Sequence, residues 1–179
     1  MDLALPALAN RFSVVTLAER RVPAWSRLLD WPAAGSGHVP VRARRLSDRN
    51  LLAAKIDRAV LDADRAVLLV AEGAGCFAAA WWARLSPADY VGRVAGALFF
   101  EPGAKDEARF ASPRVALPFP SVVVGDAEMR ALADGWGSSV VEGDEGPFVR
   151  AQRAVQRFTA AVVEREVSRG ERLWLGVVR

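Results

Sequence analysis

The sequence predicts an α/β protein, a three-layer αβα sandwich built on a mostly parallel sheet. Uninterrupted apolar runs of strand length, such as Ala66–Ala71, are typical of strands that are covered on both sides. These runs alternate with segments of helical periodicity, which indicates parallel strands joined by helices. The chain has 179 residues, of which 52% are hydrophobic, and is predicted to form one domain, 1–179, with a core at about 11–166 and a tail at 167–179.

The expected strands are apolar runs bounded by turn residues. In order they are Arg11–Leu17, Val39–Leu46, Ala66–Ala71, Ala95–Phe100, Ser121–Val124 and Ser138–Val141. Val39–Leu46 interleaves small apolar residues with arginine and contains Pro40, a pattern that favours a partly exposed edge strand. The sheet should therefore end at this strand.

The expected helices carry apolar residues at helical spacing. They are Val22–Trp31, Ser47–Leu61 with Ser47 as the N-cap, Cys76–Ala83, Glu128–Trp136 and Phe148–Glu166. Pro32 ends the first of them. The segment Lys105–Pro118 is polar and irregular, so a surface loop is expected there.

A tight turn of small residues, Glu72-Gly73-Ala74-Gly75, joins the strand Ala66–Ala71 to a helix without a polar face. Two kinds of site use such a strand, turn and helix: a nucleophile elbow of the Gly-x-Ser-x-Gly type and a glycine-rich phosphate loop. Gly73-x-Gly75-x-x-Ala78 also fits the dinucleotide fingerprint, with Glu101 as an acid for the ribose. Nucleotide binding is therefore one alternative function.

Ala71-Glu72-Gly73-Ala74-Gly75-Cys76 is followed by Ala80-Trp81-Trp82-Ala83, and later by Leu117–Pro120 and Ala131–Gly137. In this order the segments resemble the small single-domain serine hydrolases of the YdeN and retinoblastoma-binding-protein-nine type, within the α/β-hydrolase superfamily. Members of that family carry Gly-His-Ser-Leu-Gly-Cys at the first position. The resemblance covers roughly 13–164 and implies a minimal α/β-hydrolase fold.

The catalytic triad of that family is not carried over. Gly73 stands where the nucleophilic serine is expected, Asp126 is the nearest candidate in the acid region, and Glu145 occupies the base region. His38, the single histidine, precedes the expected edge strand and should lie at the N-terminal end of the sheet, away from the site. We therefore assign no catalytic residue and predict a pseudoenzyme with a binding role.

The elbow still predicts a ligand pocket, with Leu17, Glu72, Gly73 and Ala74 as candidate lining residues. Backbone donors near Leu17 and Ala74 would form a corner like an oxyanion hole. Cys76 follows on an apolar helix, where cysteine packs as a small hydrophobic residue.

A weak carboxylesterase acting through carboxylates is the main alternative function. Acids follow or flank several expected strand ends, and clustered carboxylates can act as a general acid and base or hold a hard cation; these acids are Glu72, Asp126, Glu142, Asp144 and Glu145. If the protein is active, it should hydrolyse esters. One histidine and one cysteine exclude multi-histidine metal sites, and no metal or cofactor is expected.

The expected partners are a small molecule and another protein chain. Trp174 lies in an apolar tail that could add to a sheet edge of this chain or of a partner, including a second copy. The net charge is only +3 and the arginines are scattered, so no nucleic acid is expected. No apolar stretch is long enough for a bilayer, and Met1–Ala9 lacks the basic start of a signal peptide, which favours the cytoplasm.

Overall fold

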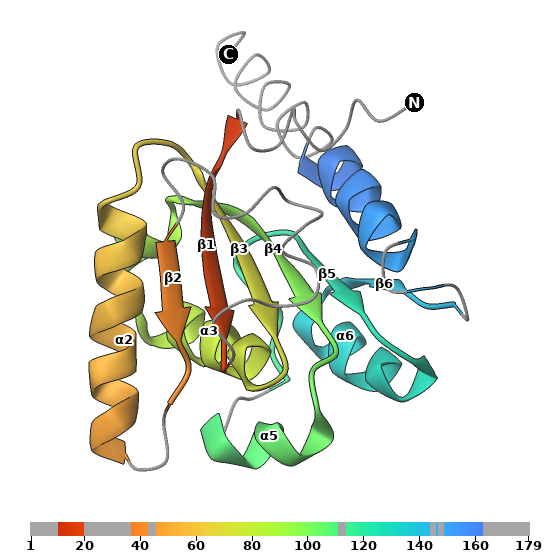
Figure 1. Cartoon of the computed structure of the whole chain (residues 1–179), viewed down its shortest axis with the longest axis horizontal. Helices are drawn as coiled ribbons and strands as arrows, with labels where there is room; N and C mark the ends of the chain where they lie inside the picture. Colours follow the sequence, from red (N-terminus) through yellow and green to blue (C-terminus); the bar gives the residue numbers. More distant parts are fainter. Residues whose placement is uncertain are drawn as a thin grey trace, which may run out of the picture.

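Six parallel strands form one sheet in the order β2-β1-β3-β4-β5-β6 in the computed structural model of the chain (Figure 1). The strands are β1 (Ser13–Ala18), β2 (Gly37–Pro40), β3 (Val67–Glu72), β4 (Val94–Phe100), β5 (Ser121–Val124) and β6 (Ser139–Val141). The structure describes residues 11–19, 37–42, 46–110, 114–143, 146 and 149–162.

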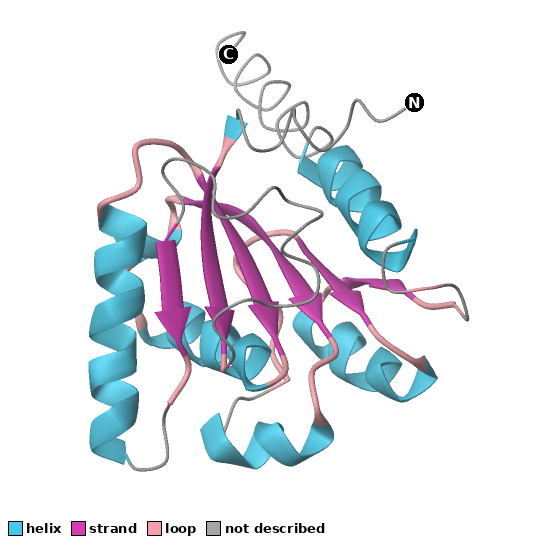
Figure 2. Ribbon diagram, viewed as in Figure 1, coloured by secondary structure: helices cyan, strands magenta, loops and turns pink. Residues whose placement is uncertain are grey.

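Helices cover both faces of this sheet (Figure 2). They are α2 (Leu46–Leu61), α3 (Ala74–Leu85), α4 (Ala88–Val91), α5 (Ala104–Phe110), a 3₁₀ turn η2 (Ala127–Met129), α6 (Arg130–Trp136) and the helical residues 149–162. One core layer lies between the sheet and α2, α3 and α6, and the other between the opposite face and residues 149–162. The predicted three-layer α/β fold is confirmed.

The central strands are buried on both faces, as their uninterrupted apolar runs predict. Every residue of β1 is buried, and Val67–Ala71 of β3 are fully buried. Alternate side chains of β3 enter the two core layers, Leu69 on one face and Leu68 on the other. A polar residue at either position would therefore have no access to water.

The helix α3 has no polar face, because the residues from Ala74 to Ala83 are all buried. Trp82 lies beneath the sheet and donates from Nε1 to the Asp57 carboxylate of α2 at 2.7 Å. This bond satisfies the only polar atom of the indole while its ring fills the core. Both members of the Trp81–Trp82 pair are core residues.

Three predictions differ from the observed elements. Ser47, the expected N-cap, lies inside α2, which begins at Leu46. The edge strand β2 covers Gly37–Pro40 instead of Val39–Leu46, because its partner β1 ends at Ala18; the Val41 amide makes the last bond, 3.0 Å to the Ala18 carbonyl. The segment expected to be a loop begins with α5, which buries Phe110 against Trp81 at a ring distance of 6.3 Å. The predicted helix Val22–Trp31 and the tail lie outside the described residues. Within the described residues, no helix is long and apolar enough to cross a membrane.

Candidate functional site

The elbow after β3 has the backbone geometry of a sharp strand-to-helix turn. Gly73 lies between the end of β3 and the start of α3, with φ 54° and ψ −122°. Residues other than glycine rarely adopt such a positive φ, because their Cβ atom clashes with the backbone; glycine has no Cβ atom and tolerates it. The Gly73 amide donates to the Phe100 carbonyl of β4 at 3.0 Å, so the turn is tied to the neighbouring strand. A Cβ atom at Gly73 would meet nothing within 4 Å, so the position opens onto free space.

Gly75 has a different role in the same turn. A Cβ atom there would overlap the backbone carbonyl of Leu17 at the end of β1. The first turn of α3 therefore lies directly against β1, at a distance that only glycine permits. Leu17 is itself fully buried below this contact.

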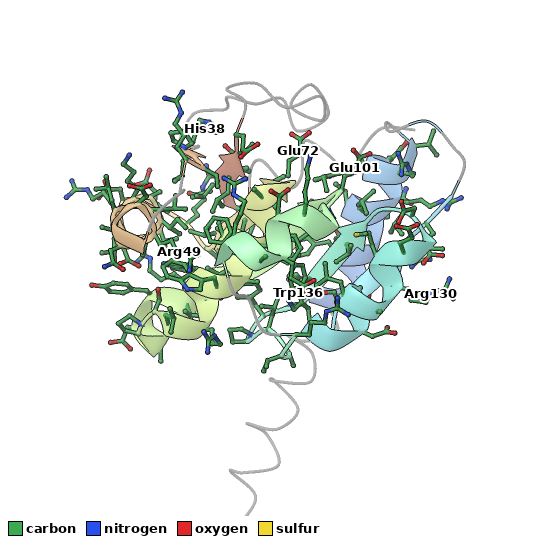
Figure 3. All side chains as sticks on the ribbon, turned by 90° about the horizontal axis from the view of Figure 1, so that it is seen from below. His38, Arg49, Glu72, Glu101, Arg130 and Trp136 are labelled. Carbon is green, nitrogen blue, oxygen red and sulfur yellow. The ribbon has the colours of Figure 1, made fainter. Side chains whose placement is uncertain are left out.

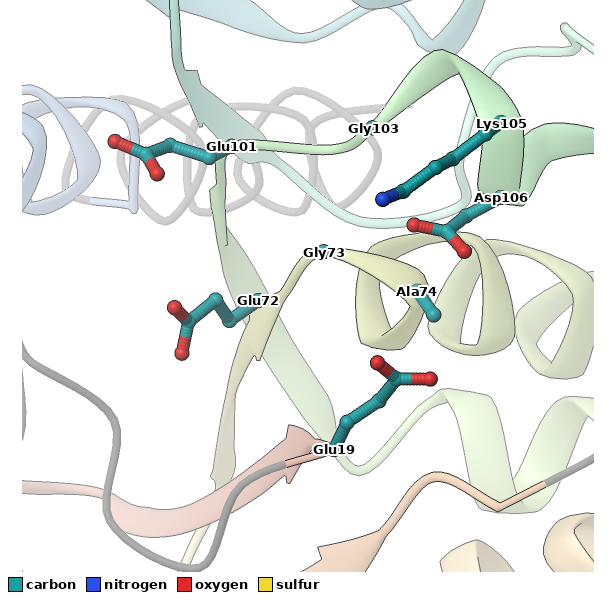
Figure 4. A pocket seen from close by; sticks show the side chains of 8 residues that line it. All are labelled: Glu19, Glu72, Gly73, Ala74, Glu101, Gly103, Lys105 and Asp106. Carbon is teal, nitrogen blue, oxygen red and sulfur yellow. The ribbon is translucent and has the colours of Figure 1, made fainter.

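A pocket of about 240 Å³ lies over the elbow (Figure 4). Its lining comes from the C-terminal ends of β1, β3 and β4 and from the start of α5: Glu19, Glu72, Gly73, Ala74, Glu101, Gly103, Lys105 and Asp106. Ligand sites of open parallel sheets gather at this edge. The pocket is therefore where the fold would place a binding site.

Among the described residues, four carboxylates and one lysine line the pocket, and two arginines offset part of the negative charge. Arg109 donates to Glu19 at 2.7 Å and to Asp106 at 3.0 Å; the hydrogen bond to Glu19 is the main reason that the pKa of Arg109 is raised. Arg150 lies 3.3 Å from Glu101. Figure 4 shows the Lys105 side chain extending from α5 toward the elbow. In the described part of the chain, four carboxylates thus lie with three cationic groups at the pocket.

Glu101 has a strained backbone at the edge of the pocket. Its φ of 48° is the only positive φ of a non-glycine residue in the described segments. Its amide donates to the Val124 carbonyl at 2.8 Å, and Pro102 follows it. Strain of this kind is held by the surrounding structure and is common at functional sites.

Two substitutions at Glu101 test whether its positive φ lowers stability independently of the charge of its side chain. Glu101→Asn and Glu101→Gln lose the same charge and the same pair with Arg150, but asparagine adopts positive φ more readily. We expect the asparagine variant to be more stable by about 0.5–1 kcal/mol, as measured by urea unfolding. Equal stability of the two variants would mean that φ at this position stores no strain.

Three of the four candidate lining residues, Glu72, Gly73 and Ala74, border the pocket. The fourth, Leu17, does not, because the first turn of α3 covers it. Glu145 and Asp144 lie outside the described residues.

Two described members of the expected carboxylate cluster, Asp126 and Glu142, make other contacts. Asp126 caps η2 by accepting the Glu128 amide at 3.1 Å, and Glu142 pairs with Arg130 at 2.6 Å. The Arg130 hydrogen bond holds the pKa of Glu142 below its usual value. Figure 3 shows Glu72 and Glu101 apart from Arg130. Glu72 is thus the only described member of the predicted cluster that borders the pocket.

His38 lies within β2 and does not precede it, contrary to the prediction. It is paired in register with Thr16 of β1, and its Nδ1 lies 2.8 Å from the Thr16 hydroxyl. His38 does not line the pocket, and Thr16 is fully buried. This pair therefore offers no accessible nucleophile.

Cys76 packs as a small hydrophobic residue, as predicted. It is fully buried, and its thiol donates to the Phe100 carbonyl at 3.6 Å. Burial is the main reason that the pKa of this thiol is raised well above its usual value. The nucleophilic thiolate is therefore disfavoured.

Several lining residues were not recognised in the sequence. Glu19 follows β1 directly, so the rule that gathers side chains at strand ends could have identified it. Lys105 and Asp106 lie on α5, and the expectation of a loop there hid them. Among the described residues, no group of three or more His, Cys, Asp or Glu side chains is placed to hold a metal ion.

Comparison with known proteins supports the fold. No protein-family model matches the sequence, and no curated protein matches it. The chain is similar to the crystal structure of a protein from Pectobacterium atrosepticum described as a YdeN-like hydrolase. The match has a TM-score of 0.66 at 16% identity and covers 90% of this chain and 96% of the other. The chain is thus an α/β-hydrolase-fold protein.

Proposed function

We propose that this protein is a catalytically degenerate member of the α/β-hydrolase fold that binds a small polar molecule over the elbow. The observation that carries the proposal is the tip of the elbow itself. Gly73 keeps a positive φ and opens into a pocket, but it supplies no oxygen to attack a carbonyl. The shape of a hydrolase site is present without its nucleophile.

The described residues around the tip offer no substitute for the missing serine. The Cys76 thiol is fully buried and its pKa is raised, and His38 contacts Thr16 in the sheet. Three of the lining carboxylates are held in ion pairs: Glu19 and Asp106 with Arg109, and Glu101 with Arg150. A pocket without an activated nucleophile binds its ligand and releases it unchanged.

The charges of the pocket favour a ligand with hydrogen-bond donors. Among the described residues, four carboxylates line the pocket and three cationic groups, Lys105, Arg109 and Arg150, lie in or beside it; the carboxylates accept hydrogen bonds. A small amine fits this chemistry, because an ammonium group can bind several carboxylate oxygens at once. The volume of about 240 Å³ suits a molecule of a few heavy atoms.

Thermal unfolding with ethanolamine, putrescine and propionate tests the binding role. The amines should raise the Tm and propionate should not; a ligand at a hundred times its Kd adds ~2.7 kcal/mol of stability. Gly73→Phe should abolish the shift because its ring enters the pocket. Gly73→Ala carries the same backbone strain without filling the space and should keep the shift. Absence of any amine effect on the unmodified protein, or an effect that survives in Gly73→Phe, would refute this role.

The loss of catalysis is tested with a fluorophosphonate probe and short p-nitrophenyl esters. The protein should remain unlabelled and the esters intact, and Gly73→Ser should be equally inactive, because no histidine of the described pocket lining can activate the serine. Labelling of the unmodified protein would overturn the proposal. Ester turnover lost in Glu145→Gln would support the carboxylate esterase instead. A Tm shift with NAD or NADP would support the nucleotide-binding alternative.

A further inference from the structure

The lining of the elbow pocket carries charges of both signs. Lys105, in the first turn of α5, is the one cationic residue among the described lining residues, and it is exposed to solvent. Its ammonium group forms no ion pair with any described residue, whereas Arg109 and Arg150, beside the pocket, are each paired with lining carboxylates. The Lys105 ammonium is therefore the cation that the pocket can offer to a ligand.

Two carboxylates lie across the elbow from Lys105. Glu72 is the last residue of β3 and is paired in register with Phe100 of β4, and Glu101 follows Phe100 directly. The two acids thus occupy the ends of neighbouring strands. In Figure 4 their side chains lie on one side of Gly73 and the Lys105 side chain lies on the other. Negative and positive groups are therefore separated across the tip of the elbow.

The ion pairs at the pocket leave room for both halves of such a ligand. Arg109 donates to Glu19 at 2.7 Å and to Asp106 at 3.0 Å, so that its charge offsets the acids that an anionic group beside the lysine would meet. Arg150 donates to one oxygen of Glu101, Oε1, at 3.3 Å. A carboxylate has two oxygens and can accept several hydrogen bonds, so Glu101 can also accept from an ammonium group.

We propose that the ligand of this pocket is a small zwitterion, an ω-amino acid whose carboxylate binds Lys105 and whose ammonium group binds Glu72 and Glu101. This inference rests on the proposed binding role of the pocket and adds the anionic half of the ligand. A ligand with charge of one sign would leave the groups of the other sign without a partner. An ammonium group has three donors, which two carboxylates can share. β-Alanine, a short ω-amino acid, suits the volume of about 240 Å³.

Isothermal titration calorimetry with β-alanine and β-alaninamide tests the inference. The two compounds share the ammonium group and have nearly the same shape, but only β-alanine has a carboxylate. We expect β-alanine to bind the unmodified protein about three- to fivefold more tightly than its amide, because it gains one ion pair with an exposed lysine. The titration is made at low ionic strength, since salt screens exposed charges.

Substitution of Lys105 assigns the carboxylate to its partner. Lys105→Met should remove the preference for β-alanine over its amide, and Lys105→Arg, which keeps the positive charge, should keep the preference. Lys55→Met is the matched control. It removes the same charge from an exposed position of α2 that does not line the pocket, so it should retain the preference of the unmodified protein.

The possible failures of this inference and of the proposed function give different results. Equal affinities of the unmodified protein for β-alanine and its amide would overturn the zwitterion and leave the binding of an amine standing. A preference for β-alanine that persists in Lys105→Met would also overturn the inference, because the carboxylate would then bind elsewhere. Absence of binding by both compounds would overturn the inference together with the binding role of the pocket.

Discussion

Gly75→Ala is expected to destabilise the protein by roughly 3 kcal/mol or more, because the new methyl group would overlap the backbone carbonyl of Leu17. A side chain that meets the end of a flexible neighbour can be accommodated by a change of rotamer. Here the obstacle is the backbone of the buried strand β1. Either α3 or β1 must move, and the bonds that join β1 to β2 and β3 resist that movement. The free energy of unfolding in urea measures the effect.

Two other glycines provide the controls for this substitution. Gly73→Ala has open space but a positive φ, so it should cost only about 1–2 kcal/mol of backbone strain. At Gly146 nothing lies within 4 Å and no positive φ is imposed, so alanine should leave stability within about 0.5 kcal/mol. Similar costs at Gly73 and Gly75 would contradict the steric explanation.

Phe158→Ala is expected to cost about 3–5 kcal/mol, the loss of a large side chain from the core layer between the sheet and residues 149–162. Phe158 is fully buried, and its ring contacts Phe12 edge to face at 6.0 Å. Val149→Ala on the same helix is the control, because Val149 is exposed to solvent. Its effect should stay below about 1 kcal/mol.

The partner of Phe158 across this layer is Gly96 of β4. A Cβ atom at Gly96 would overlap the Phe158 ring and would lie 2.6 Å from the Pro120 carbonyl. Gly96→Ala should therefore cost less in the Phe158→Ala background than alone, with a coupling of about 1 kcal/mol or more. Additive effects of the two substitutions would mean that the ring and the glycine do not share this space.

The order of strands and helices could be predicted because apolar runs report burial directly. Ala66–Ala71 has no polar position, as expected for a strand that is covered on both faces. Short elements gave weaker patterns. The helix α5 buries Phe110 as its only aromatic side chain, which leaves no periodicity to detect. The bounds of β2 depend on where β1 stops, which the β2 segment itself does not encode.

The elbow could be predicted, but most of the pocket could not. Glu72, Gly73 and Ala74 are consecutive, whereas Glu19, Glu101 and Asp106 approach them only through the pairing of β1, β3 and β4. An acid after a strand can equally cap a turn, as Asp126 does. The sequence pattern is the same in both cases, and the neighbouring strand decides between them.

The parallel arrangement of the sheet has a consequence for how this chain folds. None of the described strands is joined to its partner by a hairpin; the first pair of the central ladder, Ser13 with Val67, is far apart in sequence. Long loops must therefore close before strand pairing gains any free energy. Folding should accordingly be slow for a chain of this size, with the edges of β3 and its neighbours exposed until the crossover helices dock.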